Sequence, residues 1–448
     1  MLSAESFQTS SLRSASEGEA ITRILAASIR AVDPAAAVDH FVRREGDALT
    51  VYDRTYNLGS YRRVALLGIG KASLAMSARL AGILGARLQA GLVVIKHAYA
   101  IPEFPFSVLE GEHPIPGNRS LEAGQKTMEF VSSLGPDDLL FCLISGGGSA
   151  LMVTPVERLL LKDLQALTSL LLASGARVDE LNSLRRRLER LKGGGLVRAS
   201  NGATIVSLIL SDVVGNPLEA IASGPTAPDP TYKSDALALV EKYELSGKIP
   251  ASILTALEQA PETAKPGDPI FEKVQNLIVG SNLMAAQSAL AQAGMEGFHP
   301  YLLRINQQGE ARQAAFELAT ILRQAKKTGD PVPIPACIVV GGETTVTLRG
   351  KGKGGRNMEL ALAAVTELAD FPGVILVTLA TDGEDGPTDA AGAVVTGESF
   401  RRAAGHGLDP GDYLDRNDSY TFFAALDDLL KPGPTGTNVN DLMFLFVL

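Results

Sequence analysis

The chain has 448 residues, of which 46% are hydrophobic and 20% charged, and its net charge is -9. These values fit a globular protein with substantial cores, and the length suggests two domains. The acidic balance argues against nucleic acid as the main partner. No apolar run is long enough to span a bilayer, so no membrane partner is expected.

The N-terminal residues and the cysteines give expectations about location. Residues 1–16 are rich in serine and lack a basic region followed by an apolar core. We interpret them as a loose tail rather than a secretion signal. Cys142 and Cys337 each lie in a run that predicts a buried strand, which favours core residues over a disulfide or a metal pair. We therefore expect a reducing compartment, with the cytoplasm as the default.

Apolar patterns predict alternating strands and helices up to residue 245. Ile21, Ile24 and Leu25 fall on one helical face, and Pro34 suits the first turn of a second short helix. Buried strands are predicted at residues 64–69, 92–95, 139–144 and 204–210, and helices at residues 17–31, 73–84, 119–133, 160–171 and 181–191. Strands of this kind, separated by helices, indicate a mostly parallel sheet covered on both faces.

A shift towards proline, glycine and charge between residues 245 and 269 predicts a domain boundary. A second α/β series follows. Its strands are expected at residues 277–279, 298–303, 336–340, 344–348 and 374–379, and its helices at residues 282–293, 310–326 and 358–368. This series also contains a basic glycine-rich loop at residues 349–356 and an acidic loop at residues 381–389.

The segment 139–151 carries the clearest functional pattern. An apolar run of strand length is followed by five small residues, Ser145, Gly146, Gly147, Gly148 and Ser149, and then by apolar residues again. Glycines permit positive φ, so the backbone N–H groups of such a loop can converge on a ligand oxygen. A helix starting just after the loop would add its positive end. The alternative is a tight strand-to-helix turn with nothing bound.

Five polar clusters follow predicted strands: Lys71, residues 145–149, Asp212, residues 349–356 and residues 382–389. Ligands of open α/β sheets bind beyond the carboxyl ends of the strands, which favours one shared crevice. The clusters supply a glycine cradle, fixed cations and carboxylates, which are the parts that phosphoryl transfer needs.

Two of these clusters have simpler interpretations when taken singly. Lys71 opens a helix against the helix dipole, which favours anion binding over a merely exposed lysine. Asp212 resembles a magnesium carboxylate, and equally a cap for a helix beginning at Pro217.

Other charged residues also have alternatives. The loop at residues 349–356 is expected to be a mobile basic loop or a solvated hairpin tip, and most cations of residues 185–192 are expected on a solvated helix face. His113 is a candidate base or a structural loop histidine, and a zinc site is not expected.

Taken together, these clusters resemble the glycerate 2-kinases of the MOFRL type, the class II glycerate kinases. The resemblance covers about residue 21 to the C-terminus. Its motifs are Gly68-Ile69-Gly70-Lys71-Ala72, Glu112-His113-Pro114, residues 143–151, Leu191-Lys192-Gly193-Gly194-Gly195-Leu196, Leu210-Ser211-Asp212-Val213, Ile221-Ala222-Ser223-Gly224-Pro225-Thr226, Gly280-Ser281-Asn282, Gly341-Gly342-Glu343-Thr344, Gly354-Gly355-Arg356-Asn357, Thr381-Asp382-Gly383, Asp385-Gly386-Pro387-Thr388, Asn417-Asp418-Ser419 and Gly436-Thr437-Asn438-Val439.

The resemblance implies a fold, a reaction and partners. The expected fold has a Rossmann-like, doubly wound N-terminal domain at residues 17–260, a smaller α/β C-terminal domain of MOFRL type at residues 275–448, and an active-site cleft between them. The implied reaction is phosphorylation of D-glycerate at the 2-hydroxyl with ATP and Mg²⁺, giving 2-phosphoglycerate and ADP. The expected partners are these small molecules, and a homodimer is an allowed assembly.

The resemblance also implies site residues. Family residues that match Lys71 and Arg356 are regarded as active-site residues, so both are expected to be catalytic. Substrate or nucleotide binding is expected of Gly70, Ser145, Gly146, Gly147, Gly148, Ser149, Lys192, Asn282, Glu343 and Asn357, and metal binding of Asp212, Asp382 and Asp385. This sequence departs from the family pattern at Asn216, where aspartate is common, and at Met358, where glutamine usually follows Arg-Asn.

Two other functions remain as alternatives. Some sequences of this kind have been labelled hydroxypyruvate reductases, so an NAD(P)H-dependent reductase is the second enzymatic interpretation. The turn at residues 68–73 argues against it, because Ser73 takes the last place of the dinucleotide pattern GxGxxG. A non-catalytic binding protein for sugar acids or phosphate is a third interpretation, but it would need neither the separate cationic loops nor the acidic loop.

Overall fold

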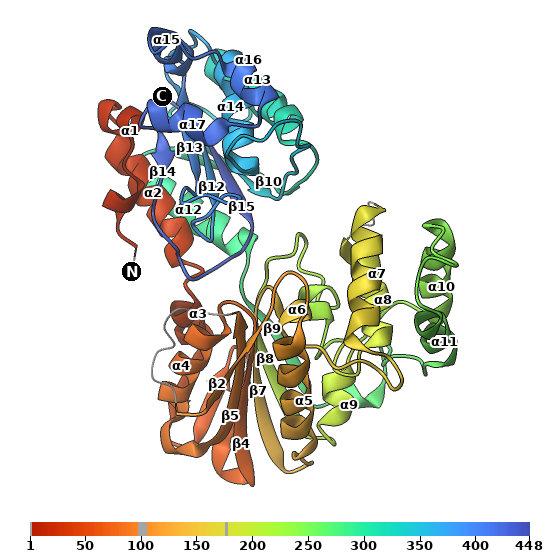
Figure 1. Cartoon of the computed structure of the whole chain (residues 1–448). Coiled ribbons are helices and arrows are strands. Elements are labelled where there is room, and N and C mark those ends of the chain that lie inside the picture. Colours follow the sequence, from red (N-terminus) through yellow and green to blue (C-terminus); the bar gives the residue numbers. More distant parts are fainter. Residues whose placement is uncertain (1, 97–104, 175–177) are drawn as a thin grey trace. The chain divides into compact units, whose positions relative to one another are not determined.

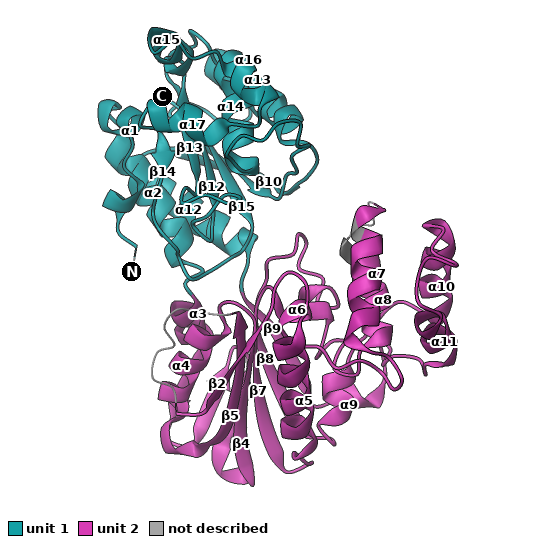
Figure 2. Ribbon diagram, viewed as in Figure 1, with its two compact units in different colours: residues 1–33, 280–448 teal, residues 34–279 magenta. Residues whose placement is uncertain are grey.

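The computed structural model describes residues 2–96, 105–174 and 178–448. The chain forms two compact units (Figure 1, Figure 2). Unit 1 comprises Met1–Asp33 and Gly280–Leu448, and unit 2 comprises Pro34–Val279. The described part of the chain has no helix long and apolar enough to cross a membrane.

Unit 2 is built on a six-stranded sheet in the order β6-β5-β4-β7-β8-β9. Its strands are β4 (Arg63–Ile69), β5 (Leu88–Lys96), β6 (Ser107–Gly111), β7 (Asp138–Ile144), β8 (Thr204–Leu210) and β9 (Val274–Gly280). The pairs from β6 to β8 are parallel. The chain builds outward from β4 to β6, then returns beside β4 and continues from β7, which is the doubly wound order. The predicted Rossmann-like sheet is therefore confirmed.

Some helices of unit 2 cover this sheet, and others form a separate group beside it (Figure 1). The helices near the sheet are α3 (Pro34–Phe41), α4 (Ser73–Leu84), α5 (Asn118–Ser132), α6 (Gly148–Leu151) and α9 (Gly195–Ala199). The separate group contains α7 (Leu161–Ala173), α8 (Val178–Leu188), α10 (Lys233–Lys242) and α11 (Ala251–Gln259), which share a leucine-rich core. A small antiparallel sheet contains β1 (Val42–Glu45), β2 (Ala48–Val51) and β3 (Arg54–Asn57).

Unit 1 has its own six-stranded sheet in the order β10-β11-β15-β12-β13-β14. The strands are β10 (His299–Gln307), β11 (Ala336–Gly342), β12 (Val374–Ala380), β13 (Gly392–Thr396), β14 (Leu429–Leu430) and β15 (Asp441–Val447). The helices are α1 (Ser10–Ser14), α2 (Gly18–Arg30), α12 (Asn282–Met295), α13 (Ala311–Thr328), α14 (Arg356–Glu367), α15 (Ser399–Gly405), α16 (Pro410–Asp415) and α17 (Ser419–Ala425). Strand β15 lies antiparallel between β11 and β12, so the C-terminal residues form a central strand.

The N-terminal residues differ from the sequence prediction. Helix α2 was expected in the N-terminal domain, but it buries Ile21, Ile24 and Leu25 and packs on α12 in unit 1. The expected loose tail at residues 1–16 is also wrong for the described residues, because Phe7 is buried and Ser11 donates two 2.8 Å hydrogen bonds to Asp428. Apolar side chains in this short stretch therefore anchor it to a distant part of the chain.

Two further elements were misplaced from the sequence. The region 245–269 contains α11 and lies within unit 2, because the chain leaves this unit only after Val279. Residues 344–348 form no strand, since the N–H of Thr345 bonds to the carbonyl of Gly309 and the N–H of Thr347 to the Glu310 side chain. Composition and short apolar runs do not encode these long-range partners.

The placement of α2 can be tested with Ile24→Ala. Removing this buried side chain should lower the free energy of unfolding of unit 1 by about 2–5 kcal/mol. Hydrogen exchange should speed up in residues 280–448 and stay unchanged in residues 34–279. Arg30→Ala, at an exposed position of the same helix, is the control. Faster exchange confined to residues 34–279 would contradict the discontinuous unit.

Candidate active site

The central feature of unit 2 is the carboxyl edge of β4 and β7. These neighbouring strands lie at the switch point, where connections leave in opposite directions and ligands of open α/β sheets bind. Gly70 and Lys71 follow β4, and the glycine loop, residues 145–149, follows β7. Asp212, which follows β8, lies against the same loop, so the structure brings three of the five predicted clusters together.

The glycine loop is packed so closely that its glycines are required. A Cβ on Gly146 would lie 1.9 Å from Oδ2 of Asp212, and a Cβ on Gly148 would lie 2.8 Å from Cβ of Ala222. Gly147 has a φ of 87°, which favours glycine. The loop therefore holds the carboxylate of Asp212 directly against its backbone. Asp212 does not cap a helix at Pro217, because no helix begins there.

Ser145 joins the two loops of the switch point. Its hydroxyl accepts a 3.0 Å hydrogen bond from the N–H of Ala72, and its N–H donates to the carbonyl of Ile69 at 2.9 Å. A Cβ on Gly70 would collide with Ser145, at 2.4 Å from its carbonyl oxygen. Ser145 and Gly70 thus fix the loops in place, and the expectation that both also contact a ligand stays a prediction.

Lys71 and His113 lie beside the glycine loop. The N–H of Lys71 donates to the carbonyl of Gly146 at 3.0 Å. A Cβ on Gly147 would lie 3.4 Å from Cγ of Lys71 and 3.3 Å from Cδ2 of His113. Burial, together with the positive charge of Lys71, lowers the pKa of His113 to about 4. His113 is therefore neutral at neutral pH, beside an exposed lysine.

A buried polar network supports Ser149, the last residue of the glycine loop. The hydroxyls of Ser149 and Ser223 are 2.8 Å apart, and Ser223 donates to Oδ1 of Asn182 at 3.1 Å. Ala222 and Ser223 have φ values of 49° and 61°, which is strained backbone for residues with a side chain. The segment 221–226 had stood out in the sequence only as a motif, and neither Ser223 nor Asn182 was predicted as a site residue.

Lys192 belongs to the same network. Its Nζ donates to the carbonyl of Ser149 and, at 2.7 Å, to Oε1 of Glu189. Burial lowers the pKa of Lys192 to about 8, against the opposing charge of Glu189. The Nζ of Lys192 thus contacts the glycine loop through a backbone carbonyl, and both of its hydrogen-bond acceptors named here are protein oxygens.

The expectation that the cations of α8 and the following turn form a mostly solvated face is wrong for three of them. Arg186, Arg187 and Lys192 are buried. The Nε of Arg186 bonds to Asp229 at 2.9 Å, and Nη1 of Arg187 bonds to Glu262 at 2.9 Å. Carboxylates distant in the sequence compensate these charges, and leucine spacing does not reveal such pairs.

Unit 1 gathers a second cluster at one edge of its sheet, around Arg356. Strand β11 ends next to Glu343, and β15 begins with Asp441 at the same edge. The Nε and Nη2 of Arg356 donate to the two oxygens of Asp441, with the longer bond at 3.2 Å, and Nη1 donates to Glu343. Burial opposes the charge of Arg356, but Asp441 and Glu343 outweigh it and raise the pKa of the guanidinium. Asp441 was not predicted from the sequence.

Asp385 closes the start of α14. It accepts hydrogen bonds from the N–H of Met358 at 2.8 Å and from the N–H of Asn357 at 3.1 Å. Burial raises the pKa of Asp385 to about 7, although these bonds oppose the shift. Asp385, which was expected to bind a metal ion, thus caps the start of α14. Oδ1 of Asn357, by contrast, has no hydrogen-bond partner among the described residues.

Asn282 and Asp382 complete the predicted positions in unit 1. The Nδ2 of buried Asn282 donates to the carbonyls of Val439 and Asp441 at 3.0 and 2.9 Å, so it links α12 to the start of β15. Asp382 is partly exposed, and its Oδ1 accepts from the N–H of Glu384 at 3.1 Å. The described residues contain no group of three or more histidine, cysteine, aspartate or glutamate side chains that could hold a metal ion.

The basic loop at residues 349–356 is not a free hairpin tip. The N–H groups of Arg349 and Gly350 donate to Oδ1 of Asn417, and the N–H of Lys353 donates to Asp418. A Cβ on Gly350 would lie 2.3 Å from the carbonyl oxygen of Arg416. The glycines therefore allow close packing on the segment 416–419, where sequence composition suggested mobility.

Comparisons with known proteins agree with this architecture. A domain of unknown function, DUF4147, matches residues 20–258, and the MOFRL family matches residues 336–441. The chain is 37% identical over 431 residues to a glycerate 2-kinase of Pyrococcus horikoshii, covering 95% of this chain and 96% of that one. The crystal structure of a glycerate kinase of Thermotoga maritima matches with a TM-score of 0.84 and 36% identity, over 95% of this chain and 98% of that one.

The chain belongs to the MOFRL family of glycerate kinases. A relative from Agrobacterium vitis, 40% identical over 387 residues and covering 86% of this chain and 87% of that one, is provisionally named as a hydroxypyruvate reductase. In this MOFRL glycerate kinase, packing leaves no space for a side chain at Gly70, Gly146 and Gly148.

The close contact between Gly146 and Asp212 can be tested with Gly146→Ala. The added Cβ would push the Asp212 carboxylate away, so we expect kcat/KM for phosphorylation of glycerate to fall about 100-fold. Gly82→Ala is the matched control, because a Cβ there meets no heavy atom within 4 Å on the exposed side of α4. Equal activity of the two variants would show that the position of Asp212 does not matter for the reaction.

Proposed function

We propose that the chain phosphorylates the 2-hydroxyl group of D-glycerate with ATP, giving 2-phosphoglycerate and ADP. The observation that carries the proposal is the glycine loop with Lys71 at the switch point of unit 2, an arrangement suited to phosphate oxygens. Similarity to a protein named glycerate 2-kinase supports the position of the phosphorylated hydroxyl. The hydroxyl oxygen bonds to the γ-phosphorus, the bond from phosphorus to the ADP oxygen breaks, and the hydroxyl proton is released.

Lys71 is assigned to the charge that develops on the transferring phosphoryl group. Its backbone is fixed by the hydrogen bond to Gly146, while its side chain extends past Gly147 and is exposed. An ammonium group beside a glycine loop can stabilise negative charge that develops on a phosphoryl group. Such a cation acts mainly on the transition state.

Arg356 is assigned the same kind of role in unit 1. Three of its N–H groups are engaged by Asp441 and Glu343 among the described residues, out of the five that a guanidinium carries. The bidentate contact with Asp441 fixes the plane of the guanidinium, so the other two N–H groups keep one direction. They can bind an oxygen of a phosphate or a carboxylate, and Asn357 offers an adjacent polar side chain.

Asp212 is our principal candidate for holding Mg²⁺ with the nucleotide. Mg²⁺ in kinase sites is commonly bound by one or two carboxylates together with substrate phosphates, so a cluster of three protein ligands is not required. Asp212 lies against the glycine loop, which fits this mode. When bound, the ion would neutralise charge on the phosphate oxygens. Asp382 is a second candidate, whereas both oxygens of Asp385 already accept helix N–H groups.

We do not assign to His113 the removal of the proton from the attacking hydroxyl group. A pKa of about 4 makes this imidazole a weak base at neutral pH, far from the value that suits general-base catalysis. Its neutral ring instead adds no further positive charge beside Lys71.

A hydroxypyruvate reductase is the second candidate because of the provisional name given to two relatives. The turn after β4 argues against it. It places Ser73 at the final position of the dinucleotide motif, and Lys71 lies within the turn. A test for oxidation of NADH or NADPH with hydroxypyruvate, beside a test for ADP formation with D-glycerate, separates the two reactions.

The roles of Lys71 and Arg356 can be tested by Lys71→Ala, Arg356→Ala and Arg356→Lys. Each alanine variant should lower kcat about 10²–10³-fold, with a smaller rise in KM, because the lost interaction is strongest in the transition state. Arg356→Lys should not recover full activity, since a point charge cannot replace the bidentate contact with Asp441. Lys126→Ala, at an exposed position of α5, is the control.

A different kinetic pattern would change these assignments. If Arg356→Ala raises KM for glycerate and leaves kcat nearly intact, Arg356 binds the glycerate carboxylate in ground and transition states alike. The same result for Lys71→Ala would contradict its assignment as a catalytic residue. Melting temperatures must accompany the assays, because Arg356→Ala also leaves Asp441 buried without its cation.

The metal assignment can be tested with Asp212→Asn. Loss of a carboxylate ligand should raise the Mg²⁺ concentration that gives half-maximal activity, and should weaken binding of Mn²⁺ in the presence of ATP, measured by electron paramagnetic resonance. Asp137→Asn, which precedes β7 at the opposite edge of the sheet, is the control. Unchanged metal dependence in Asp212→Asn would mean that the nucleotide or another residue holds the ion.

A further inference from the structure

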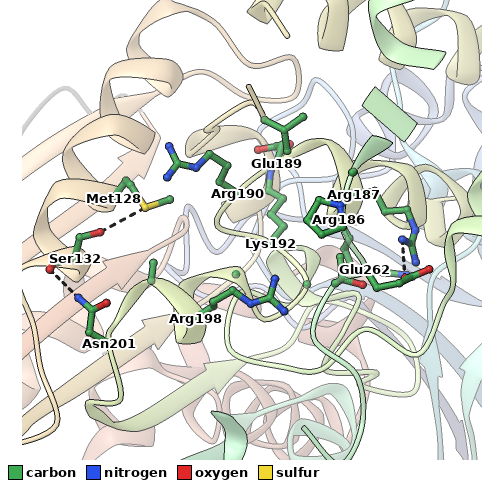
Figure 3. Close-up of a pocket in the computed structure, with 17 residues that line it drawn as sticks. Met128, Ser132, Arg186, Arg187, Glu189, Arg190, Lys192, Arg198, Asn201 and Glu262 are labelled. Atoms are coloured by element: carbon green, nitrogen blue, oxygen red, sulfur yellow. Dashed lines mark hydrogen bonds and ion pairs between the residues drawn. The ribbon is translucent and has the colours of Figure 1, made fainter. Parts of the chain in front are cut away.

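Unit 2 contains a cavity of about 320 Å³ away from the glycine loop (Figure 3). It lies among the C-terminal half of α5, the turn after α8, α9 and residues 260–263. None of Lys71, residues 145–149 and Asp212 lines it. The cavity is therefore separate from the candidate active site, and its volume suits a small ligand.

The lining of this cavity is strongly cationic. Its charged residues are Arg186, Arg187, Arg190, Lys192, Arg198, Glu189 and Glu262. Three of the five cations have carboxylate partners: Arg186 with Asp229, Arg187 with Glu262 and Lys192 with Glu189. The two remaining cations, Arg190 and Arg198, have no such carboxylate partner among the described residues.

Arg190 and Arg198 have exposed side chains at this cavity. Within the described residues, neither has a carboxylate within 4.0 Å, and both line the cavity together with three other cations. Repulsion among such cations is relieved by an anion. Two guanidinium groups are also the donors that match the several oxygens of a phosphate group.

A second observation comes from buried atoms of the lining. Arg187 and Glu189 are only 3% and 5% exposed. In the part of the chain that the structure describes, Nε of Arg187 and Oε2 of Glu189 have no hydrogen-bond partner. Buried polar atoms rarely stay unpaired. Nε can donate to an acceptor, and Oε2 can accept from a donor such as a hydroxyl group.

We propose that this cavity is a binding site for a small organic phosphate that also carries a hydroxyl group. The phosphate binds Arg190 and Arg198, and a hydroxyl donates to Glu189. Figure 3 shows the ion pair of Arg187 with Glu262 on one side of the cavity, and Asn201 bonded to Ser132 on the other. These bonds hold the walls in place. The site goes beyond the proposed function, which uses the glycine loop.

The position of Lys192 gives the site a direct contact with the candidate active site. Its side chain lines the cavity, and its Nζ donates to the carbonyl of Ser149 in the glycine loop. Glu189, which we expect to accept from the ligand hydroxyl, also accepts from Lys192. A ligand at the cavity is thus one side chain away from the loop.

The test is calorimetric titration of the full-length protein with glycerol 1-phosphate, without nucleotide. The double variant Arg190→Ala/Arg198→Ala should lose a binding event, with affinity reduced at least about tenfold, because two charge-assisted contacts are removed. The control Arg30→Ala/Arg401→Ala removes the same charge from exposed positions of α2 and α15 and should bind as the wild type does. Arg190→Lys/Arg198→Lys should bind with intermediate affinity.

Lys71→Ala separates this site from the active site. The binding event lost in Arg190→Ala/Arg198→Ala should persist in Lys71→Ala. A titration that is unchanged in the double variant, or abolished by Lys71→Ala alone, would overturn the proposal. Tighter binding of malate than of glycerol 1-phosphate would overturn the ligand class. A melting temperature equal to that of the wild type should show that Arg190→Ala/Arg198→Ala is folded. If that variant is unfolded, Arg190→Lys/Arg198→Lys is compared with the wild type in its place.

Discussion

The structure of unit 2 depends on how closely several backbone segments approach one another at the switch point. Gly70 lies against Ser145, Gly146 against Asp212, and Gly148 against Ala222, each at distances that exclude a Cβ. Close packing of this kind leaves the loop little freedom to rearrange. A catalytic site benefits, because groups that are already in position need no reorganisation when charge develops. The strained backbone at Ala222 and Ser223 is part of this arrangement.

Unit 1 fixes its main cation by a different means. The loop before Arg356 is packed through its glycines, and the guanidinium is held by the carboxylates of Asp441 and Glu343. Burial raises the pKa of Asp441, because the charged carboxylate is unfavourable away from water. Removing Arg356 would therefore leave this buried charge without its cation and destabilise the fold. Unit 2 places Lys71 by backbone contacts, whereas unit 1 places Arg356 by ion pairing. The exposed lysine and the partly buried arginine are therefore expected to respond differently to salt.

The sequence predicted the regular elements better than their long-range partners. Continuous apolar runs located β4, β7, β8 and β12, because strands buried on both faces have a distinctive composition. Glycine motifs located the loops after β4 and β7. The contact of Asp441 with Arg356 and the pair Arg186–Asp229 could not be predicted from the sequence, because residues far apart in the chain meet only after folding. The discontinuous unit 1 was missed for the same reason, since α2 resembles any amphipathic helix.

The division of the chain has a consequence for its synthesis. Helix α2 precedes unit 2 in the chain, but its packing partner α12 follows only after all of unit 2, and the central strand β15 follows later still. Unit 2 can fold as soon as its residues emerge, since its core needs nothing from the rest. Until α12 has been made, the apolar face of α2, with Ile21, Ile24 and Leu25, lacks this packing partner. The two parts of unit 1 can therefore be joined only after unit 2 has been made.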